Sequence, residues 1–325
     1  MDPYDIFSIA NAKQFEKMAL KVFRHQYENT IVYREFCDLL GVDKTAVKSL
    51  EAIPFLPIQF FKSHTIVSNF QTPEITFTSS GTTGMQTSNH VVTDLQLYRQ
   101  SFRSAFATFY GNIEDYAILA LLPSYLEREG SSLIYMVADL IEGSQNEQSG
   151  FYLHNYDELI QKLKALDASG QNTLLIGVTY ALLDLIEKET FQLKNTIIME
   201  TGGMKGRRKE MIREELHQLL RAGFGVPTIH SEYGMTELLS QAYSFGEGNF
   251  ECPPWMHVLM RDPEDPLRYV ADGKNGGINV IDLANYNACS FIATQDLGKK
   301  HSSNAFEVLG RFDHSDIRGC NLMVI

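Results

Sequence analysis

The sequence of 325 residues has few cysteines, no long hydrophobic run and fewer basic than acidic residues. Its four cysteines are widely spaced without a Cys-x-x-Cys pair, so neither a zinc site nor a disulfide framework is predicted. The densest apolar run, residues 116–122, is far too short to span a bilayer. The first residues lack the basic-then-apolar pattern of a signal peptide. We therefore expect a cytoplasmic protein without a membrane span.

Positive charge is also scarce. The chain has 28 Lys and Arg against 40 Asp and Glu, a net charge of −12. Such a surface repels nucleic acid and anionic membranes, so a polyanionic ligand must enter a local pocket. Hydrophobic residues make up 44% of the chain, which is ordinary for a globular enzyme.

Several catalytic motifs are missing. The Gly-x4-Gly-Lys-Ser/Thr pattern is absent, which disfavours an ordinary P-loop NTPase. There is no Gly-x-Ser-x-Gly elbow of a hydrolase, and the helical zinc-protease and calcium-loop patterns are absent as well.

The pattern of apolar residues divides the chain into three parts. Residues 1–52 read as helical, with Asn11 and Gln14 resembling a capping box. An extended, proline-containing connector opens residues 53–245, where apolar strands then alternate with helix-period segments, as in a nucleotide-binding core. Residues 246–325 have short segments between prolines and glycines, as in a β-rich subdomain. We predict an α/β fold with mixed or parallel sheets covered by helices, plus a smaller antiparallel β subdomain. Expected helices include one started by Thr93 with Gln96 and one over 207–220.

A loop of hydroxyls and glycines follows a short strand near residue 78. Glycines let an anion approach the backbone, and hydroxyls add donors beside the backbone N–H groups. The predicted phosphate-binding residues are Ser79, Ser80, Gly81, Thr82, Thr83 and Gly84. The alternative is a solvated turn between two strands.

Two further loops occur where apolar strands end. In the first, residues 200–206, Gly202 and Gly203 let backbone approach a flat ring, and Lys205 follows. In the second, residues 231–237, an aromatic face and a small hinge precede a hydroxyl and a carboxylate, contributed by Tyr233, Gly234, Thr236 and Glu237. An aromatic ring can stack on a base, a hydroxyl can bond a phosphate oxygen, and a carboxylate can hold Mg²⁺. Each loop could equally be a capped helix start.

The C-terminal part contains Thr294-Gln295-Asp296-Leu297-Gly298 and the segment 310–319. Asp296 can accept both ribose hydroxyls, and Arg311 can reinforce the same sugar or a phosphate. Either segment alone could be an ordinary acidic turn.

The order of these motifs resembles the adenylate-forming superfamily of acyl-CoA ligases, peptide-synthetase adenylation domains and luciferases. The resemblance covers residues 54–320. In that superfamily Thr-Ser-Gly-Thr-Thr-Gly wraps the triphosphate, Tyr-Gly-x-Thr-Glu contacts adenine, α-phosphate and Mg²⁺, Thr-Gly-Asp binds ribose, and Gly-Arg-x-Asp marks a hinge. The helical opening, the connector after residue 55 and the short tail are most similar to the acyl-protein synthetases of the bacterial luminescence fatty-acid reductase.

This resemblance implies ATP-dependent activation of a carboxylic acid, in these relatives a fatty acid, as acyl-AMP with Mg²⁺. The acyl group then passes to a cysteine near the C-terminus, and Cys320 sits near the expected place. Cysteine suits this step because its thiolate is a good nucleophile at neutral pH. The alternative role of Cys320 is that of a small buried hydrophobe. The implied partners are the carboxylic acid and an acyl-reductase or acyl-acceptor protein.

The chain also departs from the superfamily pattern. Met85-Gln86-Thr87 replaces the usual Pro-Lys, and Gln295 replaces the glycine before Asp296. The sequence ends just after the hinge motif, so the small C-terminal domain with its catalytic lysine is expected to be absent. A partner or a basic residue such as Lys205 would then replace that lysine.

Two other functions fit the same residues. One is an AMP-forming ligase that delivers the acyl group to coenzyme A or another small thiol. The other is a catalytically lapsed nucleotide-binding interaction module. Neither acyl chain length, the final acceptor, the pathway nor the oligomeric state follows from the sequence.

Overall fold

The computed structural model describes residues 2–68, 72–79, 87–123, 130–202, 211–301 and 305–312. Its α-helices are α1 (Ala12–Asn29), α2 (Ile31–Leu39), α3 (Phe60–Ser63), α4 (Leu95–Tyr110), α6 (Ser132–Gly143), α7 (Tyr156–Ser169), α8 (Thr179–Lys188) and α9 (Arg213–Phe224), and its 3₁₀ turns are η1 (Pro3–Ser8), η2 (Leu50–Ala52), η3 (Ile113–Asp115) and η4 (Leu283–Asn285). None of the helices within these ranges combines the length and hydrophobicity that a bilayer crossing requires.

The strands lie mostly in one large mixed sheet, whose order is β11-β12-β13-β14-β10-β9-β8-β7-β6-β4-β5, with β1 added beside β13. A separate hairpin joins β2 and β3. The strands are β1 (Leu56–Pro57), β2 (Ile75–Thr78), β3 (Asn89–Val92), β4 (Ala117–Leu121), β5 (Gly150–Tyr152), β6 (Thr173–Val178), β7 (Thr196–Thr201), β8 (His230–Tyr233), β9 (Ala242–Ser244), β10 (Asn249–Glu251), β11 (Met256–Arg261), β12 (Asn275–Asp282), β13 (Phe291–Lys300) and β14 (Ala305–Arg311).

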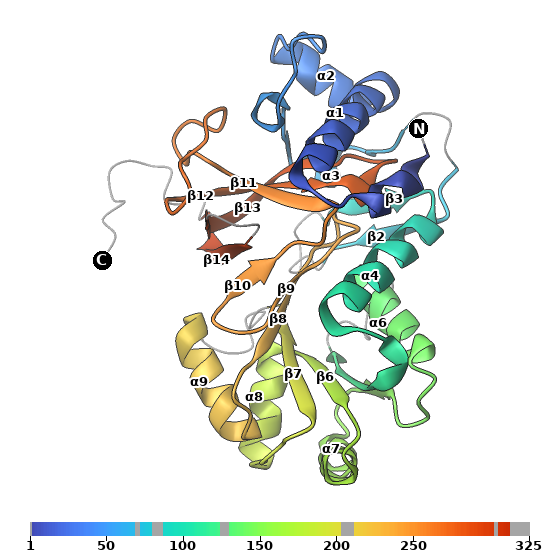
Figure 1. The fold of residues 1–325 in the computed structure, drawn as a ribbon, viewed down its shortest axis with the longest axis vertical. Coiled ribbons are helices and arrows are strands. Elements are labelled where there is room, and N and C mark those ends of the chain that lie inside the picture. The colour runs from blue at the N-terminus through green and yellow to red at the C-terminus, as the bar shows by residue number, and fades with distance from the viewer. Residues whose placement is uncertain are drawn as a thin grey trace.

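The sheet changes character at β8. Strands β5, β4, β6, β7 and β8 pair in parallel, whereas β8 to β14 pair antiparallel. Strands β4 and β6 are nearly continuous apolar runs and are buried along their whole length, because helices cover both faces of this part of the sheet. Figure 1 shows α8 and α9 on one side of β6 and β7, with α4 and α6 on the other. The predicted combination of a helix-covered parallel sheet and an antiparallel β part is therefore confirmed.

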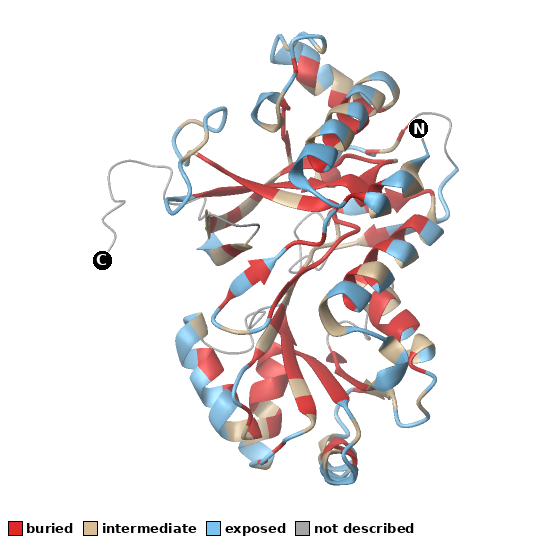
Figure 2. Ribbon diagram, in the orientation of Figure 1, coloured by how far each residue is buried: buried red, intermediate tan, exposed pale blue. Residues whose placement is uncertain are grey.

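Burial follows these layers. Figure 2 shows the buried residues concentrated in the strands and on the inward faces of the helices. In the register, Val178 of β6 pairs with Thr201 of β7, which pairs with Glu232 of β8. The carboxyl ends of these three strands therefore lie side by side, which is where open α/β sheets bind ligands.

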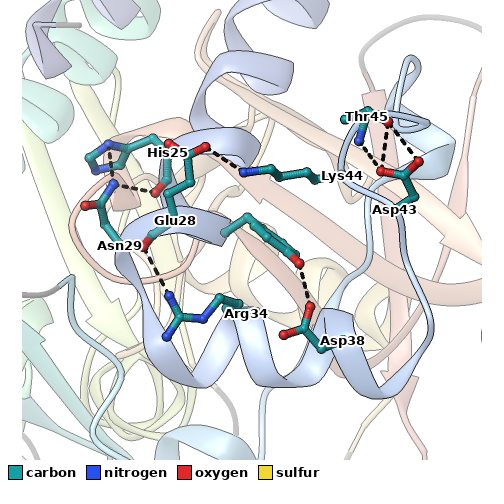
Figure 3. Close-up of polar contacts among 9 residues, drawn as sticks. His25, Glu28, Asn29, Arg34, Asp38, Asp43, Lys44 and Thr45 are labelled. Carbon is teal, nitrogen blue, oxygen red and sulfur yellow. Dashed lines mark hydrogen bonds and ion pairs between the residues drawn. The ribbon is translucent and has the colours of Figure 1, made fainter.

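The N-terminal helices pack on the antiparallel part of the sheet. Asn11 caps α1 by accepting from the Gln14 amide at 3.1 Å, and Gln14 reaches back to the Ala10 amide at 2.7 Å. The predicted cap at Asn11 is confirmed. The solvent side carries surface pairs such as Lys44 with Glu28, 2.9 Å apart (Figure 3).

The buried side of α1 carries a polar side chain as well. The Nε2 of Gln26 donates to the carbonyls of Asn285 and Tyr286, both at 2.9 Å, and its Oε1 accepts from the Ser290 amide at 2.9 Å. Gln26 is fully buried, so these bonds fix α1 to the segment between β12 and β13.

Two helix boundaries differ from the sequence prediction. Helix α4 is capped by Asp94, which accepts from the Leu97 amide at 3.0 Å, and not by Thr93 with Gln96. Asp94 is one residue closer to the helix, and its carboxylate also favours the positive helix end. Helix α9 spans Arg213–Phe224, whereas the prediction was 207–220; residues 211–212 are not helical, and 207–210 lie outside the described residues.

The connector after residue 55 also differs in part. Leu56 and Pro57 are extended and pair in parallel with β13, as expected for a proline-containing segment. Residues 60–63 then form the single helical turn α3, where an extended chain was predicted. No proline follows Pro57 in this turn, so its backbone N–H groups can bond, as in Phe61 to the Ile58 carbonyl at 3.1 Å.

Candidate active site

The turn after β8 carries three of the predicted site residues. The Leu238 amide donates to the Met235 carbonyl at 3.1 Å, which closes a turn with Thr236 and Glu237 at its tip. This segment is a turn between two strands, so the alternative reading of a capped helix start does not apply. The turn places Thr236 and Glu237 just beyond the carboxyl end of β8.

Several long-range bonds hold this turn in place. His90 of β3 contacts the Thr236 carbonyl through Nδ1 at 2.8 Å, and Asn285 donates to the Glu237 carbonyl at 2.6 Å. The buried Asp282 carboxylate accepts from the Leu239 amide at 2.7 Å and the Ser240 amide at 3.0 Å. The backbone of the turn is therefore fixed by side chains from β3, from the end of β12 and from η4.

Tyr233, Asp296 and Arg311 come together although they lie far apart in the sequence. The Tyr233 hydroxyl donates to Asp296 Oδ2 at 2.9 Å, and Arg311 Nε contacts Asp296 Oδ1 at 3.1 Å. The Asp296 side chain is 9% exposed, whereas that of Arg311 is 81% exposed. Burial raises the pKa of Tyr233 well above its usual range, and the Asp296 charge adds to this effect. Tyr233 therefore stays a hydrogen-bond donor at neutral pH.

The ring of Tyr233 is largely covered. It packs against Phe250 with ring centroids 5.8 Å apart and against Phe306 at 5.4 Å, and the residue is 8% exposed. Its role as a platform for a base stays a prediction. It is the hydroxyl of Tyr233 that contacts another predicted site residue, Asp296.

The buried guanidinium of Arg261 lies near Tyr233 and Asp296. Arg261 Nη1 donates to the Ile278 carbonyl at 2.8 Å and to Asn279 Oδ1 at 2.9 Å, and its guanidinium lies 5.2 Å from the centroid of the Phe312 ring. Burial lowers its pKa to about 10, while the Asp296 charge acts in the opposite direction. Arg261 is therefore a cation at neutral pH, and it adds positive potential near Asp296.

Glu237 lies between Arg311 and Ser88, which immediately precedes β3 of the hairpin. Its carboxyl is bonded by the Ser88 side chain and lies in the fields of Arg311 and Lys62. Burial raises the pKa of Glu237, and these partners oppose the rise. Ser88 in turn donates its amide to Ser79 Oγ at 2.8 Å.

The Ser79 amide donates to the Ser88 carbonyl at 3.0 Å, so Ser79 and Ser88 close the two ends of the predicted phosphate loop. Three of the predicted motifs thus converge: the flanks of the phosphate loop, the turn after β8, and Asp296 with Arg311. Ser80, Gly81, Thr82, Thr83 and Gly84 lie outside the described residues, as do Gly203, Lys205 and Cys320.

Gly202 and Gly234 lie at the ends of β7 and β8. The Gly202 carbonyl accepts from the Thr179 hydroxyl at 2.8 Å. A Cβ on Gly234 would lie 2.4 Å from Glu232 Oε1, so a larger residue at this position would force the Glu232 carboxyl to move.

Two carboxyl groups that sequence reasoning left without a role lie here. Glu232 Oε2 accepts from the Thr201 hydroxyl at 2.5 Å, and Glu200 Oε1 lies 3.7 Å from His217 Nε2. Burial raises the pKa of Glu232 to about 7; the Thr201 bond opposes this rise and the nearby Glu200 charge adds to it. Both glutamates stand in the loop sequences, but nothing in their spacing indicated that Glu200 lies close enough to influence Glu232.

Glu237 is the residue of this site that could hold a cation. Glu237 is 6% exposed, and a buried carboxylate favours a neighbouring cation. Within the described ranges no group of three or more His, Cys, Asp or Glu could hold a metal alone. A single carboxylate beside phosphates is the usual Mg²⁺ arrangement, so the residues present fit this ion.

Comparisons with known proteins show what this chain is similar to. The family model described as "Acyl-protein synthetase, LuxE" matches residues 1–110 and 144–325. The long-chain-fatty-acid–luciferin-component ligase of Vibrio harveyi is 24% identical over 340 residues, covering 97% of this chain and 89% of the relative. The ligase of the same name from Aliivibrio fischeri is 24% identical over 303 residues, covering 87% and 78%.

Solved structures show the same fold. A 2-hydroxyisobutyryl-CoA ligase in complex with 2-HIB-AMP and CoA has a TM-score of 0.68 at 14% identity, over 93% of this chain and 70% of that one. ATP-bound MatB from Rhodopseudomonas palustris has a TM-score of 0.55 at 18% identity, over 73% of this chain. The match spans about half of MatB, 47% of its chain.

Proposed function

Because the chain belongs to the LuxE acyl-protein synthetase family, we propose that it uses ATP and Mg²⁺ to activate a carboxylic acid as its acyl-adenylate and transfers the acyl group to Cys320. The relatives from Vibrio harveyi and Aliivibrio fischeri are named as ligases of long-chain fatty acids, so a fatty acid is the proposed substrate. The observation that carries the proposal is the convergence of Tyr233, Asp296, Arg311 and Glu237 beside the ends of the phosphate loop.

In this proposal Asp296 accepts the ribose hydroxyls of the nucleotide. Its two oxygens already accept from Tyr233 and Arg311, and each carboxylate oxygen has a second lone pair for a further donor. Tyr233 and Arg311 therefore orient Asp296. Arg311, with its largely exposed side chain, can swing to a phosphate without leaving a buried cavity.

Glu237 is the proposed Mg²⁺ ligand, and Thr236 the donor to the α-phosphate. When bound, Mg²⁺ would supply the charge neutralisation that lets pyrophosphate leave. The bonds from His90, Asn285 and Asp282 fix the backbone that carries both side chains, which lowers the cost of organising the site. Gly202, Gly203, Gly234 and Lys205 would border the nucleotide and the reacting carboxylate.

The other three cysteines support Cys320 as the acyl acceptor. Cys37, Cys252 and Cys289 are all buried, and burial raises the pKa of each thiol, that of Cys37 to about 12. A thiol must ionise to attack an acyl-adenylate, so these three are poor nucleophiles at neutral pH. An acyl-reductase or acyl-acceptor protein is the proposed receiver of the acyl group.

Exchange of labelled pyrophosphate into ATP, measured across a series of carboxylic acids, tests the adenylation step. The wild-type protein should show exchange that requires a carboxylic acid. Asp296→Asn should raise the KM for ATP about tenfold to a hundredfold, because charge-assisted hydrogen bonds contribute about 1.5–3 kcal/mol. Tight ATP binding without any acid-dependent exchange would refute adenylation and favour a lapsed nucleotide-binding module.

The matched control is Asp265→Asn. Asp265 also pairs with an arginine Nε at 3.1 Å, that of Arg268, but both side chains are well exposed. This substitution should leave the KM for ATP unchanged. Equal effects of the two substitutions would mean that Asp296 has no special place in nucleotide binding.

Labelled fatty acid tests the transfer step. Label should stay on the protein with ATP and Mg²⁺, and Cys320→Ser should abolish it while pyrophosphate exchange continues. Cys252→Ser is the control and should keep the label. Label that moves only to added coenzyme A would instead identify a small-thiol ligase.

A further inference from the structure

Among the buried polar side-chain atoms that lack a hydrogen-bond partner in the described part of the chain are His90 Nε2, Thr93 Oγ1 and Asn285 Oδ1. Their residues are 1%, 8% and 0% exposed. All three residues line a single cavity with a volume of about 10 Å³, whose other walls include Leu97 and Leu239. A cavity of about this size is close to the minimum that holds one water molecule, provided that polar partners line it.

The proton positions in this cavity follow from the bonds around it. His90 Nδ1 faces the Thr236 carbonyl at 2.8 Å, and a carbonyl can only accept, so Nδ1 carries the proton. Burial lowers the pKa of His90 to about 4, while the Thr236 carbonyl and the nearby Asn285 side chain, which would stabilise a charged ring, oppose this change. The ring is therefore neutral at pH 7 and holds one proton. Its Nε2 is therefore an acceptor.

The orientation of the Asn285 amide follows in the same way from its hydrogen bond. Its amide nitrogen lies 2.6 Å from the Glu237 carbonyl, so the nitrogen must face that oxygen. Its Oδ1 is then the other end of the amide and is also an acceptor. The Thr93 hydroxyl can donate. The cavity thus has two acceptors and one donor, which are the partners of one water molecule that donates twice and accepts once.

We propose that this cavity binds one structural water molecule, bridging His90, Thr93 and Asn285, and that this bridge positions the Thr236–Glu237 turn. The inference rests on the proposed function, because Thr236 and Glu237 are the groups assigned to phosphate and Mg²⁺. The water holds His90 in the tautomer that donates to Thr236, and it anchors the amide that donates to Glu237. His90 and Asn285 are positioning residues that act through the backbone of the turn.

The bridge links two parts of the site. His90 follows the phosphate loop on β3, and Thr93 lies just after that strand, whereas Asn285 belongs to η4. A shift of the hairpin would therefore move the Thr236–Glu237 turn through the same three side chains.

Variants at Thr93 test the bridge with little change in shape. Thr93→Val removes the unpartnered hydroxyl of a residue that lines the cavity. This substitution should lower the kcat of pyrophosphate exchange about threefold to tenfold, with a smaller change in the KM for ATP. Thr93→Ser keeps the hydroxyl and should restore kcat. The control is Thr45→Val, because Thr45 bonds Asp43 at 2.8 Å on the surface of the N-terminal part (Figure 3). Equal kcat in Thr93→Val and Thr93→Ser would overturn the proposal.

Variants at His90 test the tautomer. The amide of asparagine can place a donor where Nδ1 lies, whereas the amide of glutamine reaches the Nε2 position. His90→Gln should therefore lower kcat about a hundredfold, since misplacing a reacting group by about 1 Å has this effect. His90→Asn should keep most of the activity. The reverse order would contradict the assignment of Nδ1 as the donor.

Two measurements do not depend on activity. Nitrogen-15 spectroscopy of the wild-type histidines should show His90 neutral with the proton on Nδ1, and a crystal structure should show one density peak in the cavity. An Nε2-protonated ring or a dry cavity would overturn the proposal. Wild-type protein without acid-dependent exchange would instead refute the proposed function, and these two measurements would still decide the water site.

Discussion

Glu232 should make the stability of this protein depend on pH in a direction opposite to that of ordinary surface carboxylates. Its side chain lies between Thr201, which donates to it at 2.5 Å, and Gly234, whose lack of a Cβ makes room for Oε1. Burial raises its pKa from the ordinary 4.5 to about 7. The native protein therefore holds this proton across a range in which the unfolded chain has released it.

The sign and size of the effect follow from proton binding. Between pH 4.5 and about 7 the native state binds more protons than the unfolded state, so the free energy of unfolding falls as pH rises. Each pH unit in this window contributes about 1.4 kcal/mol, which gives a loss of about 3 kcal/mol by pH 8. This is a large share of the roughly 5–15 kcal/mol that stabilises a typical domain.

Glu232→Gln isolates this contribution. Glutamine resembles the protonated acid, and its oxygen can still accept from Thr201. Urea unfolding at a series of pH values should show equal stability of the two proteins near pH 4.5, with the variant more stable by about 3 kcal/mol near pH 8. His90 and His230, whose pKa values burial lowers to about 4, act in the opposite direction but cancel in the difference.

A difference that stays flat with pH would refute this reasoning, because it would mean that Glu232 titrates at the same pH in both states. A variant that loses stability at high pH relative to wild type would also refute it. In that case the charged form of Glu232, and not the neutral one, would be the form that the fold favours.

Three other substitutions should have measurable effects. Asp282→Asn should lower the free energy of unfolding by about 2–4 kcal/mol in urea, because an amide cannot accept all of the backbone and hydroxyl bonds that the buried carboxylate accepts. Gly234→Ala should lower the free energy of unfolding by about 1–3 kcal/mol in the same measurement, since the added Cβ would lie 2.4 Å from Glu232 Oε1. Unchanged stability would show that Glu232 can move away freely. Tyr233→Phe should raise the KM for ATP about threefold to tenfold without a large change in kcat, because Asp296 loses an orienting donor; an effect on kcat alone would contradict that role.

Much of the fold was predictable because it depends on local pattern. The strands at residues 117–121, 173–178 and 196–201 lie within residues 53–245, where alternating apolar strands and helices were predicted, since buried parallel strands need apolar runs. The start of α4 was predicted less accurately, because the adjacent Thr93 and Asp94 are both possible caps and only the folded backbone selects one.

The candidate site was predictable only in part. Tyr233, Asp296 and Arg311 stand in recognisable motifs, and the structure brings them into contact. His90 and Asn285 carry no motif, and they reach the turn after β8 from 146 and 48 residues away. The signal that could have indicated them is weak: a histidine within an apolar strand, and an asparagine after a buried aspartate.

The sequence by itself determined which groups this protein has for chemistry: a loop of hydroxyls and glycines, an acidic turn after a strand, and an aspartate with a following arginine. These depend on residue type and short spacing, which the chain carries directly. Only the tertiary structure decided which of these groups meet, and which buried side chains hold them. Sheet pairing and the burial of polar atoms act between residues far apart in the chain, so no local pattern records them.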